Sequence, residues 1–271
     1  MARKNWKGVK LYHYTSFPVL QGILDRGELW LCNVKVMNDK QEMFHYMSLV
    51  ENSVCEGLEP DKCGEVHRLF ANQLDRLENQ PVYAASFSRL EDDAAQWERY
   101  ASHGQGISIK FNAHLLKKIA EGRARLQPVY YTRDAKASKH TALIRDYIMT
   151  GEVDRAAWGS IDGVFENCWA ASSAYKHISF KSEKEVRLVS LPFSPRYFLG
   201  EPQYEMEEWG LREYYILNLK RNQEIPVERL IKEVMIGPRA NVTADTVERY
   251  IRSLNPEYEK IKVTQSDCPL R

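Results

Sequence analysis

The sequence has little cysteine, and its five cysteines are scattered along the chain without a CxxC pair. A structural zinc site needs thiolates or imidazoles at short, paired spacing, and Cys55 and Cys63 have no second pair to match them. A chain of 271 residues buries enough apolar surface to fold without disulfides. We therefore expect no bound metal and only reduced thiols, as is usual in the cytoplasm.

Long apolar runs are also missing. No stretch approaches the roughly 20 residues that a membrane-spanning helix needs, so we expect no membrane partner. The first seven residues are basic but lead into no apolar segment, so a signal peptide is not expected. These absences predict a cytoplasmic protein.

An excess of one charge is absent as well, because 38 lysines and arginines oppose 37 acidic residues, for a net charge of +1. DNA binding requires a concentrated basic excess, so a dedicated DNA-binding surface is not expected, although a local basic face is compatible with this balance. The motifs GxGxxG, GxxxxGK[ST], GxSxG and HExxH do not occur. Any active site must therefore be assembled from shorter patches.

The residues that are present predict an α+β protein with a single domain over residues 1–271. Helices are expected from Ser16 to a left-handed cap at Gly27, at 40–54 and 66–77, after Asp92 and Asp93, and from about Thr243. A mostly helical insertion is expected around 135–176. The connections show no βαβ rhythm, which argues against a doubly wound sheet. Strands are expected at 9–14, 28–34, 81–88, 106–111, 185–189, 213–219, 231–236 and 260–263.

Two polar patches follow the first two predicted strands. Residues 13–16 read HYTS, and their imidazole and hydroxyls are suited to hydrogen bonds with a ribose or a carboxamide. A helix N-cap beside a structural histidine is the alternative interpretation. The second patch holds Asn38, Asp39 and Glu42, and a turn with a helix start is the simpler interpretation of these residues.

A third patch joins Ser86 and Ser88 to a helix that carries Trp97 and Tyr100 on one face. Paired hydroxyls with aromatic rings above them are suited to a flat ligand, whereas packing in the core is the alternative.

A fourth patch contains two carboxylates, since strand alternation predicts Glu183, Glu185 and Arg187 on one face. Two carboxylates do not form a buried apolar surface. They indicate either a solvated edge with an ion pair, or a site where a carboxylate stabilises developing positive charge.

Taken in order, the patterns HYTS, NDxxE, SFS…W…Y…GxxIxF, FxSExExR and a final IGxR resemble a large, mostly uncharacterised bacterial family of domains of unknown function, over residues 11–251. That family in turn resembles the ADP-ribosyltransferase superfamily in short motifs and fold. The resemblance implies two short, twisted antiparallel sheets that form a cleft and are surrounded by helices. It also implies that NAD is bound there as the substrate, without a metal. The acceptor, whether protein, nucleic acid or small molecule, and the oligomeric state stay open.

The resemblance also implies roles for individual residues. Glu185 is expected to be the main catalytic carboxylate with Glu183 as its partner, because cleavage of the nicotinamide–ribose bond passes through an oxocarbenium-like state that a carboxylate stabilises. Asn38, Asp39 and Glu42 have no superfamily counterpart and are assigned to an acceptor site or to the fold. Contacts with NAD are expected from His13, Tyr14, Thr15, Ser86, Ser88, Trp97, Tyr100 and Arg187.

The function expected from the sequence is therefore that of an NAD-dependent ADP-ribosyltransferase or NAD glycohydrolase, in a toxin or phage-defence effector by family context. A non-catalytic nucleotide-binding module is one alternative. Another is a nuclease that uses Asp39, Glu42, Glu183 and Glu185 around a divalent metal.

Overall fold

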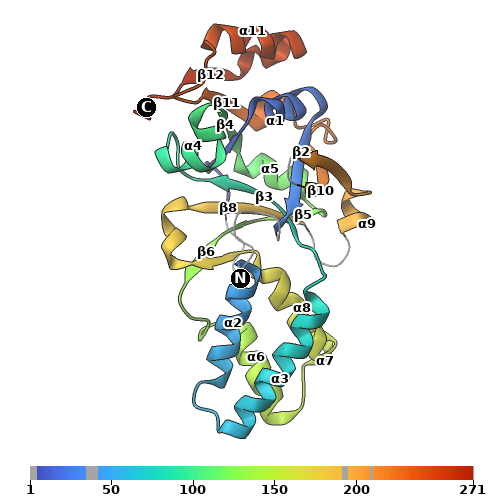
Figure 1. Ribbon diagram of the computed structural model, residues 1–271. Helices are drawn as coiled ribbons and strands as arrows, with labels where there is room; N and C mark the ends of the chain where they lie inside the picture. Colours follow the sequence, from blue (N-terminus) through green and yellow to red (C-terminus); the bar gives the residue numbers. More distant parts are fainter. Residues whose placement is uncertain (1–4, 35–41, 191–194, 208–209, 271) are drawn as a thin grey trace.

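The computed structural model describes residues 5–34, 42–190, 195–207 and 210–270. A sheet with helices packed on it occupies one part of the molecule, and a lobe of helices extends from it (Figure 1). None of the helices in these ranges is both long and apolar enough to span a bilayer. The α+β class predicted from the sequence is confirmed.

A ten-stranded, mostly antiparallel sheet forms the centre of the molecule. Eight strands follow the order β12-β11-β4-β1-β3-β2-β10-β9, while β8 pairs with β3 and β5 pairs with β8. The strands are β1 (Lys10–Thr15), β2 (Glu28–Asn33), β3 (Tyr83–Ser88), β4 (Ile107–Asn112), β5 (Ala124–Pro128), β8 (Glu185–Ser190), β9 (Gln203–Glu207), β10 (Gly210–Asn218), β11 (Ile231–Ile236) and β12 (Lys262–Gln265). Two further strands, β6 (Tyr130–Thr132) and β7 (Tyr175–His177), form a small parallel sheet.

Strand β3 is the point at which the large sheet forks. One edge of β3 pairs with β8 from Ala84 to Ser88. The other edge is shared, because β2 pairs with Tyr83 and Ala84 while β1 pairs only with Ser88. Strands β1 and β2 therefore diverge along the middle of β3. The prediction of two separate short sheets is wrong in this respect, since a single connected sheet opens between two of its strands.

The two faces of β3 and β8 differ in character, as the period-2 alternation of a strand requires. Phe87, Val186 and Leu188 point into the main apolar core, where each buried side chain contributes about 1.5–3 kcal/mol. Ser86 and Ser88 alternate with these apolar positions and lie opposite Arg187 and Glu185 in the neighbouring strand. One face of this strand pair stabilises the fold, and the other carries polar groups.

Short helices surround the sheet. Helix α4 begins where the acidic pair predicted it, with the Asp93 side chain accepting a hydrogen bond from the amide of Gln96. Thr243 caps the start of α11 in the same way, and Gly27 at φ 73° ends the turn after α1. These helices are α1 (Phe17–Gln21) with a π-helical turn (Gly22–Arg26), α4 (Ala94–Tyr100), α5 (Ala113–Ala120), α9 (Pro195–Leu199), α10 (Val227–Leu230) and α11 (Ala244–Leu254), with 3-10 turns at Ser102–Gly104, Ile178–Glu183 and Pro256–Lys260.

The helical lobe is assembled from two segments of the chain, one between β2 and β3 and one between β6 and β7. The later segment corresponds to the helical insertion expected around 135–176. Both segments share a second apolar core, and that core also includes Val82, just before β3, and Val189 of β8. The lobe helices are α2 (Glu42–Cys55), α3 (Pro60–Leu77), α6 (Lys139–Thr150), α7 (Arg155–Trp158) and α8 (Ile161–Ser172).

Two findings differ from the sequence-based expectations. Strands β11 and β12 are parallel and are joined through α11, and β6 and β7 are parallel and are joined through α6, α7 and α8, so the described residues do contain parallel strands joined by helices. Cys55 and Cys63 form a disulfide, with Cα atoms 5.1 Å apart, so the expectation of reduced thiols is wrong for this pair. Cys32, Cys168 and Cys268 form no disulfide in the described structure.

Candidate functional site

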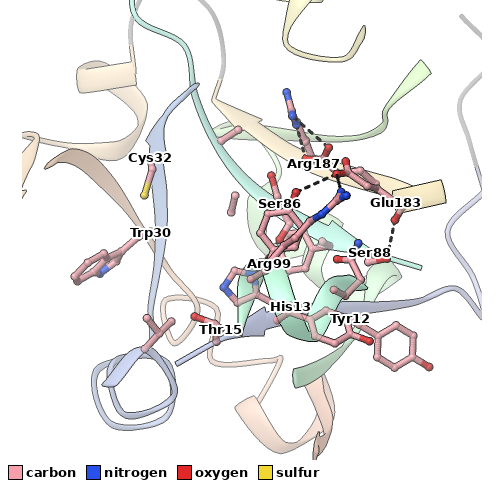
Figure 2. A pocket seen from close by; sticks show the side chains of 18 of the residues that line it. Tyr12, His13, Thr15, Trp30, Cys32, Ser86, Ser88, Arg99, Glu183 and Arg187 are labelled. Atoms are coloured by element: carbon pink, nitrogen blue, oxygen red, sulfur yellow. Dashed lines mark hydrogen bonds and ion pairs between the residues drawn. The ribbon is translucent and has the colours of Figure 1, made fainter. Parts of the chain in front are cut away.

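A cavity of about 650 Å³ opens where β1 and β2 diverge from β3 (Figure 2). Its volume lies within the range of about 300–1,000 Å³ that is typical of small-molecule sites. Side chains from β1, β2 and β3 form its floor and sides, and residues of α4 and of the segment 176–187 complete it. The lining consists of Tyr12, His13, Tyr14, Thr15, Val19, Leu29, Trp30, Cys32, Ala84, Ala85, Ser86, Phe87, Ser88, Gln96, Arg99, Tyr100, Lys176, Phe180, Glu183, Glu185, Arg187 and Arg212.

Most of the site residues predicted from the sequence meet in this cavity, although they span most of the chain. Trp97 does not line it, and Asn38 and Asp39 lie outside the described residues. Glu42 is the first residue of α2, and its side chain is outside the described part of the structure. The predicted residues that do line the cavity are His13, Tyr14, Thr15, Ser86, Ser88, Tyr100, Glu183, Glu185 and Arg187.

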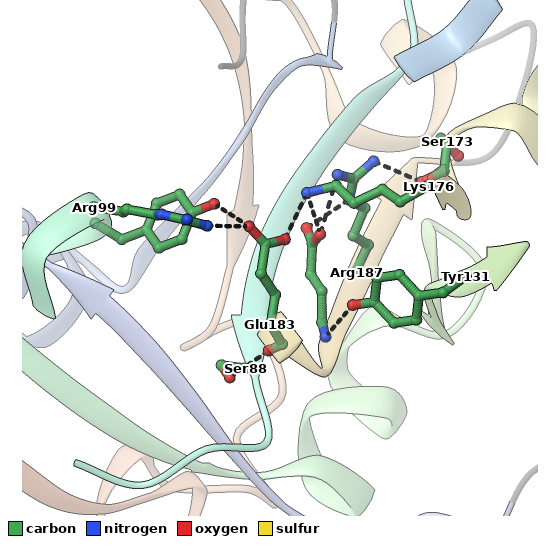
Figure 3. Close-up of polar contacts among 9 residues, drawn as sticks. Ser88, Arg99, Tyr131, Ser173, Lys176, Glu183 and Arg187 are labelled. Atoms are coloured by element: carbon green, nitrogen blue, oxygen red, sulfur yellow. Dashed lines mark hydrogen bonds and ion pairs between the residues drawn. The ribbon is translucent and has the colours of Figure 1, made fainter. Parts of the chain in front are cut away.

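Two buried glutamates share one lysine in the cavity wall (Figure 3). The Nζ of Lys176 lies 2.9 Å from Oε2 of Glu183 and 2.8 Å from Oε2 of Glu185. Glu185 also accepts two hydrogen bonds from Arg187, at 2.6 Å and 3.2 Å. Glu183 accepts hydrogen bonds from Arg99 and from the Tyr100 hydroxyl, both at 3.1 Å. The two carboxylates are therefore held side by side by three cations.

The carboxyl group of Glu185 is strongly biased toward its ionised form. Burial favours the neutral acid, but the charges of Arg187 and Lys176 outweigh it and lower the pKa of Glu185 from 4.5 to about 2. At neutral pH Glu185 is a carboxylate. A group with so low a pKa is a weak proton acceptor and a fixed source of negative charge.

Glu183 does not lie on the strand, contrary to the alternation expected from the sequence. It ends a 3-10 turn, and Lys184 then adopts a left-handed conformation, with φ 46°, before β8 begins. The Ser88 hydroxyl donates a hydrogen bond of 2.8 Å to the Glu183 carbonyl and fixes this turn against β3. The two glutamates come together through the turn and Lys176.

His13 and Ser86 meet at the fork of the sheet. The Nδ1 atom of His13 lies 2.9 Å from the carbonyl oxygen of Ser86, so Nδ1 must carry the proton. Burial lowers the pKa of His13 and outweighs this hydrogen bond, so the ring is neutral and Nε2 is an acceptor. The Ser86 Oγ is buried and has no hydrogen-bond partner within the part of the chain that the structure describes. Such an orphaned hydroxyl is uncommon, and a bound ligand would satisfy it.

The aromatic residues of the third patch have separate roles. Tyr100 borders the cavity, whereas Trp97 is fully buried, donates a 2.6 Å hydrogen bond to Asp92 and packs edge-on against Tyr14. The Tyr14 hydroxyl donates to the carbonyl of Leu90 at 3.0 Å. Trp97 is thus a core residue that supports the first strand, and its expected role in ligand contact is not supported.

Arg187 has a structural task in this wall. Besides pairing with Glu185, it donates a 2.8 Å hydrogen bond to the carbonyl of Ser173 at the end of α8. Tyr131 accepts a 2.8 Å hydrogen bond from the amide of Glu185. The sequence led us to expect Arg187 in contact with NAD, and the contacts described here show it holding the carboxylate of Glu185.

Sequence reasoning missed several residues that line the cavity. Lys176 and Arg99 both come from segments that read as ordinary amphipathic surface, and nothing local marks them. Trp30, from the second strand, stacks on Tyr214 with ring centroids 3.9 Å apart and supplies an aromatic surface. With Arg212, the lining holds four Lys and Arg side chains and two carboxylates, so 4 − 2 gives a net charge of +2 when His13 is neutral.

Residues 96–188 match the model of a family described as "Protein of unknown function (DUF2971)". The expected resemblance to a family of domains of unknown function is therefore confirmed over these residues. The DUF2971 match includes Glu183, Glu185, Lys176 and Arg99, while His13 lies outside it. Neither the comparison with curated proteins nor the comparison with solved structures found a match.

The contacts of the two glutamates also bear on the nuclease alternative. A divalent metal bound by Glu183 and Glu185 would have to displace Lys176, Arg187 and Arg99, which already neutralise them. Carboxylates that hold Mg²⁺ have oxygens directed at the ion, not at protein cations. The arrangement is better suited to an organic anion than to a metal.

Proposed function

We propose that this cavity binds NAD and that the protein transfers or hydrolyses its ADP-ribose moiety, in the manner of the ADP-ribosyltransferases. The proposal rests chiefly on the two adjacent carboxylates in the cavity wall. A histidine on the first strand, hydroxyls on β3 and a Glu-x-Glu leading into β8 are the features that this chain has in common with those enzymes. The forked sheet provides the cleft between them.

The charges of the cavity favour a dianionic, nucleotide-like ligand. The lining has a net charge of +2, and half-exposed Arg99 is available to exchange its partner Glu183 for a phosphate. Trp30 gives an aromatic surface on one side, and the carboxylates lie on the other (Figure 2). A dinucleotide has flat rings that can pack on Trp30 and a pyrophosphate that can pair with the cations of the lining.

The hydroxyl and the imidazole at the fork suit a sugar or an amide. Ser86 Oγ lacks a partner among the described residues, and the Nε2 of neutral His13 accepts a hydrogen bond. A ribose hydroxyl or a carboxamide would satisfy both. These contacts hold the substrate in the ground state and the transition state alike.

The two carboxylates then have different tasks. When the bond between ribose C1′ and the nicotinamide nitrogen breaks, nicotinamide leaves with the electron pair and positive charge develops on the sugar. Glu185, kept ionised by Arg187 and Lys176, stabilises that charge without taking a proton. Glu183 accepts the proton of the attacking water or acceptor once a substrate phosphate has drawn Arg99 away.

The decisive experiment is incubation of the protein with NAD labelled in the adenosine part. Release of nicotinamide together with free or transferred ADP-ribose supports the proposal, and analysis of protein, nucleic acid and small-molecule fractions identifies the acceptor. NAD at about 100 times its Kd should raise the unfolding free energy by about 2.7 kcal/mol. Mg²⁺ alone should not, and stabilisation by Mg²⁺ alone would favour the nuclease instead.

A non-catalytic nucleotide-binding module is the second candidate, and one observation favours it. Every oxygen of Glu183 and Glu185 is already paired with a cation or a hydroxyl, as in a structural network. If NAD binds and stabilises the protein but is recovered intact, this second function is correct.

We place either function in the cytoplasm, where NAD is abundant, and consumption of NAD there would suit a toxin or a phage-defence effector.

A further inference from the structure

Three potential metal ligands that do not line the cavity meet between α2 and α3. Figure 1 shows these two helices in the helical lobe. Cys55 is the last residue of α2, while Cys63 and His67 are one turn apart on α3. The ligand atoms all lie within 4.8 Å of one another. Within the described ranges of the chain, no other three histidine, cysteine or acidic side chains gather as closely.

The imidazole of His67 is turned toward both sulfurs. Its Nε2 lies 3.3 Å from Sγ of Cys63 and 3.9 Å from Sγ of Cys55. Its Nδ1 lies 2.8 Å from a carboxylate oxygen of Glu51. A carboxylate that accepts the Nδ1 proton leaves the Nε2 lone pair directed at the sulfurs, which is the arrangement that orients histidines at metal sites.

The two cysteines form a disulfide in this structure, and a disulfide gives the Nε2 lone pair neither a proton nor a metal. Reduction by a dithiol transfers two electrons and two protons to the pair and yields two thiols. A divalent cation that then binds both sulfurs displaces their two protons and accepts the His67 lone pair. The position of His67 is therefore explained by the reduced state and not by the disulfide.

We propose that Cys55, Cys63 and His67 bind Zn²⁺ when the cysteines are reduced. A disulfide oxidant then releases the ion, because it takes two electrons from the thiolates as the Cys55–Cys63 bond forms and, with two protons from solvent, is itself reduced to two thiols. Two thiolates and an imidazole are soft ligands that select Zn²⁺ over Mg²⁺ or Ca²⁺. The His67 side chain is 57% exposed, so water has access as the fourth ligand. Bound zinc would join the end of α2 to the first turns of α3, as the disulfide does in the oxidised protein.

The test uses the reduced full-length protein with Co²⁺ as the spectroscopic probe and Zn²⁺ as the competitor. We expect one equivalent of Co²⁺ to give thiolate charge-transfer and tetrahedral d–d bands, and Zn²⁺ to abolish them. His67→Ala should bind Co²⁺ at least tenfold more weakly, and this exposed residue can be changed without opening the core. Glu51→Gln should weaken binding by about 10–100-fold, because it removes the group that orients His67.

Two matched measurements decide the interpretation. Cys268→Ser alters a free cysteine on another part of the chain and should leave the Co²⁺ spectrum unchanged, whereas Cys63→Ser should remove the thiolate bands. Protein oxidised to the disulfide should not bind Co²⁺. Absence of tetrahedral bands in the reduced protein overturns the proposal, and so does equal loss of binding in Cys268→Ser.

Discussion

Two buried lysines each lie between two glutamates in this protein, and they belong to different parts of it. Lys176 pairs with Glu183 and Glu185 in the cavity wall. Lys110, on β4, pairs with Glu91 at 2.6 Å and with Glu233 of the neighbouring β11 at 2.8 Å. Both lysine side chains are nearly buried, at 7% and 11% exposure.

The two networks differ in what surrounds them. In the described structure Lys110, Glu91 and Glu233 do not line the cavity, and Lys110 faces Glu233 directly across two paired strands. Lys176 instead reaches from the small sheet to two carboxylates that also bind arginines at the cavity. A buried ion pair is by itself weak evidence of function, because ion-pair networks with a purely structural role shift the pKa values of their members as functional sites do. The position at a cavity is what makes the Lys176 network a candidate site.

Matched substitutions in the two networks should have the largest effect. Glu185→Gln and Glu233→Gln each leave a buried lysine with one fewer charge partner, and each should lower the unfolding free energy by about 3–5 kcal/mol. Only Glu185→Gln should also lower NAD turnover, by about 10²–10³-fold with nearly unchanged NAD affinity, because the charge acts on the transition state.

Urea unfolding and NAD hydrolysis, both measured where each variant is folded, provide the two readouts. An equal loss of turnover in Glu233→Gln would show that the loss arises from the fold, and the distinction between the two networks would not stand.

The second largest effect should be a loss of stability at low pH that depends on the Lys176 network. The pKa of Glu185 is lowered from 4.5 to about 2, so its contribution is complete above pH 4.5 and is lost as the pH falls toward 2. This lowering of the pKa corresponds to about 3 kcal/mol of stability. Urea midpoints measured from about pH 5 to about pH 2 should fall more steeply for the wild type than for Glu185→Gln. Equal slopes of the urea midpoint against pH in the two proteins would contradict the lowered pKa of Glu185. The pKa of Glu91, which Lys110 lowers, adds a loss of stability in acid that both proteins share.

Removing a hydroxyl group that donates a hydrogen bond to each network should have the smallest effect on stability and NAD affinity. Tyr100 donates a hydrogen bond to Glu183 at 3.1 Å, and Thr264 donates one to Glu233 at 2.9 Å. Tyr100→Phe and Thr264→Val should each cost about 1 kcal/mol of stability. Titration calorimetry should show NAD affinity reduced about two- to fivefold for Tyr100→Phe and unchanged for Thr264→Val. An affinity change in both variants would indicate that NAD binding follows overall stability.

The features predictable from the sequence are local ones. Asp93 and Thr243 are found at helix starts and Gly27 at a left-handed cap, because each of these signals acts within one turn of its own position. The strand at residues 106–111 was predictable from its period-2 alternation, and it corresponds to β4. The convergence of His13, Ser86 and Glu185 was expected only through a resemblance, although the cavity does join them.

The features that could not be predicted depend on distant partners. Nothing near Lys176 marks it as the bridge between two glutamates. The alternation of Glu183 and Glu185 reads as continuous strand, yet Lys184 adopts a positive φ that its residue type does not reveal. The spacing of Trp97 and Tyr100 predicts that they share a helix face, but it does not predict that Trp97 packs inward.

The pairing of β3 with β8 determines how this protein tolerates insertions and deletions. Ser86 lies opposite Arg187 and Ser88 opposite Glu185, so the polar wall depends on the register of two strands. Deleting one residue within either strand would exchange the two faces, turning apolar side chains such as Val186 toward the cavity and a serine or a charged group toward the core. Connections beyond these strands, other than the turn before β8 that carries Glu183, can change length without moving the wall. Homologues of this protein should therefore vary in the length of their loops, while β3 and β8 keep a constant length.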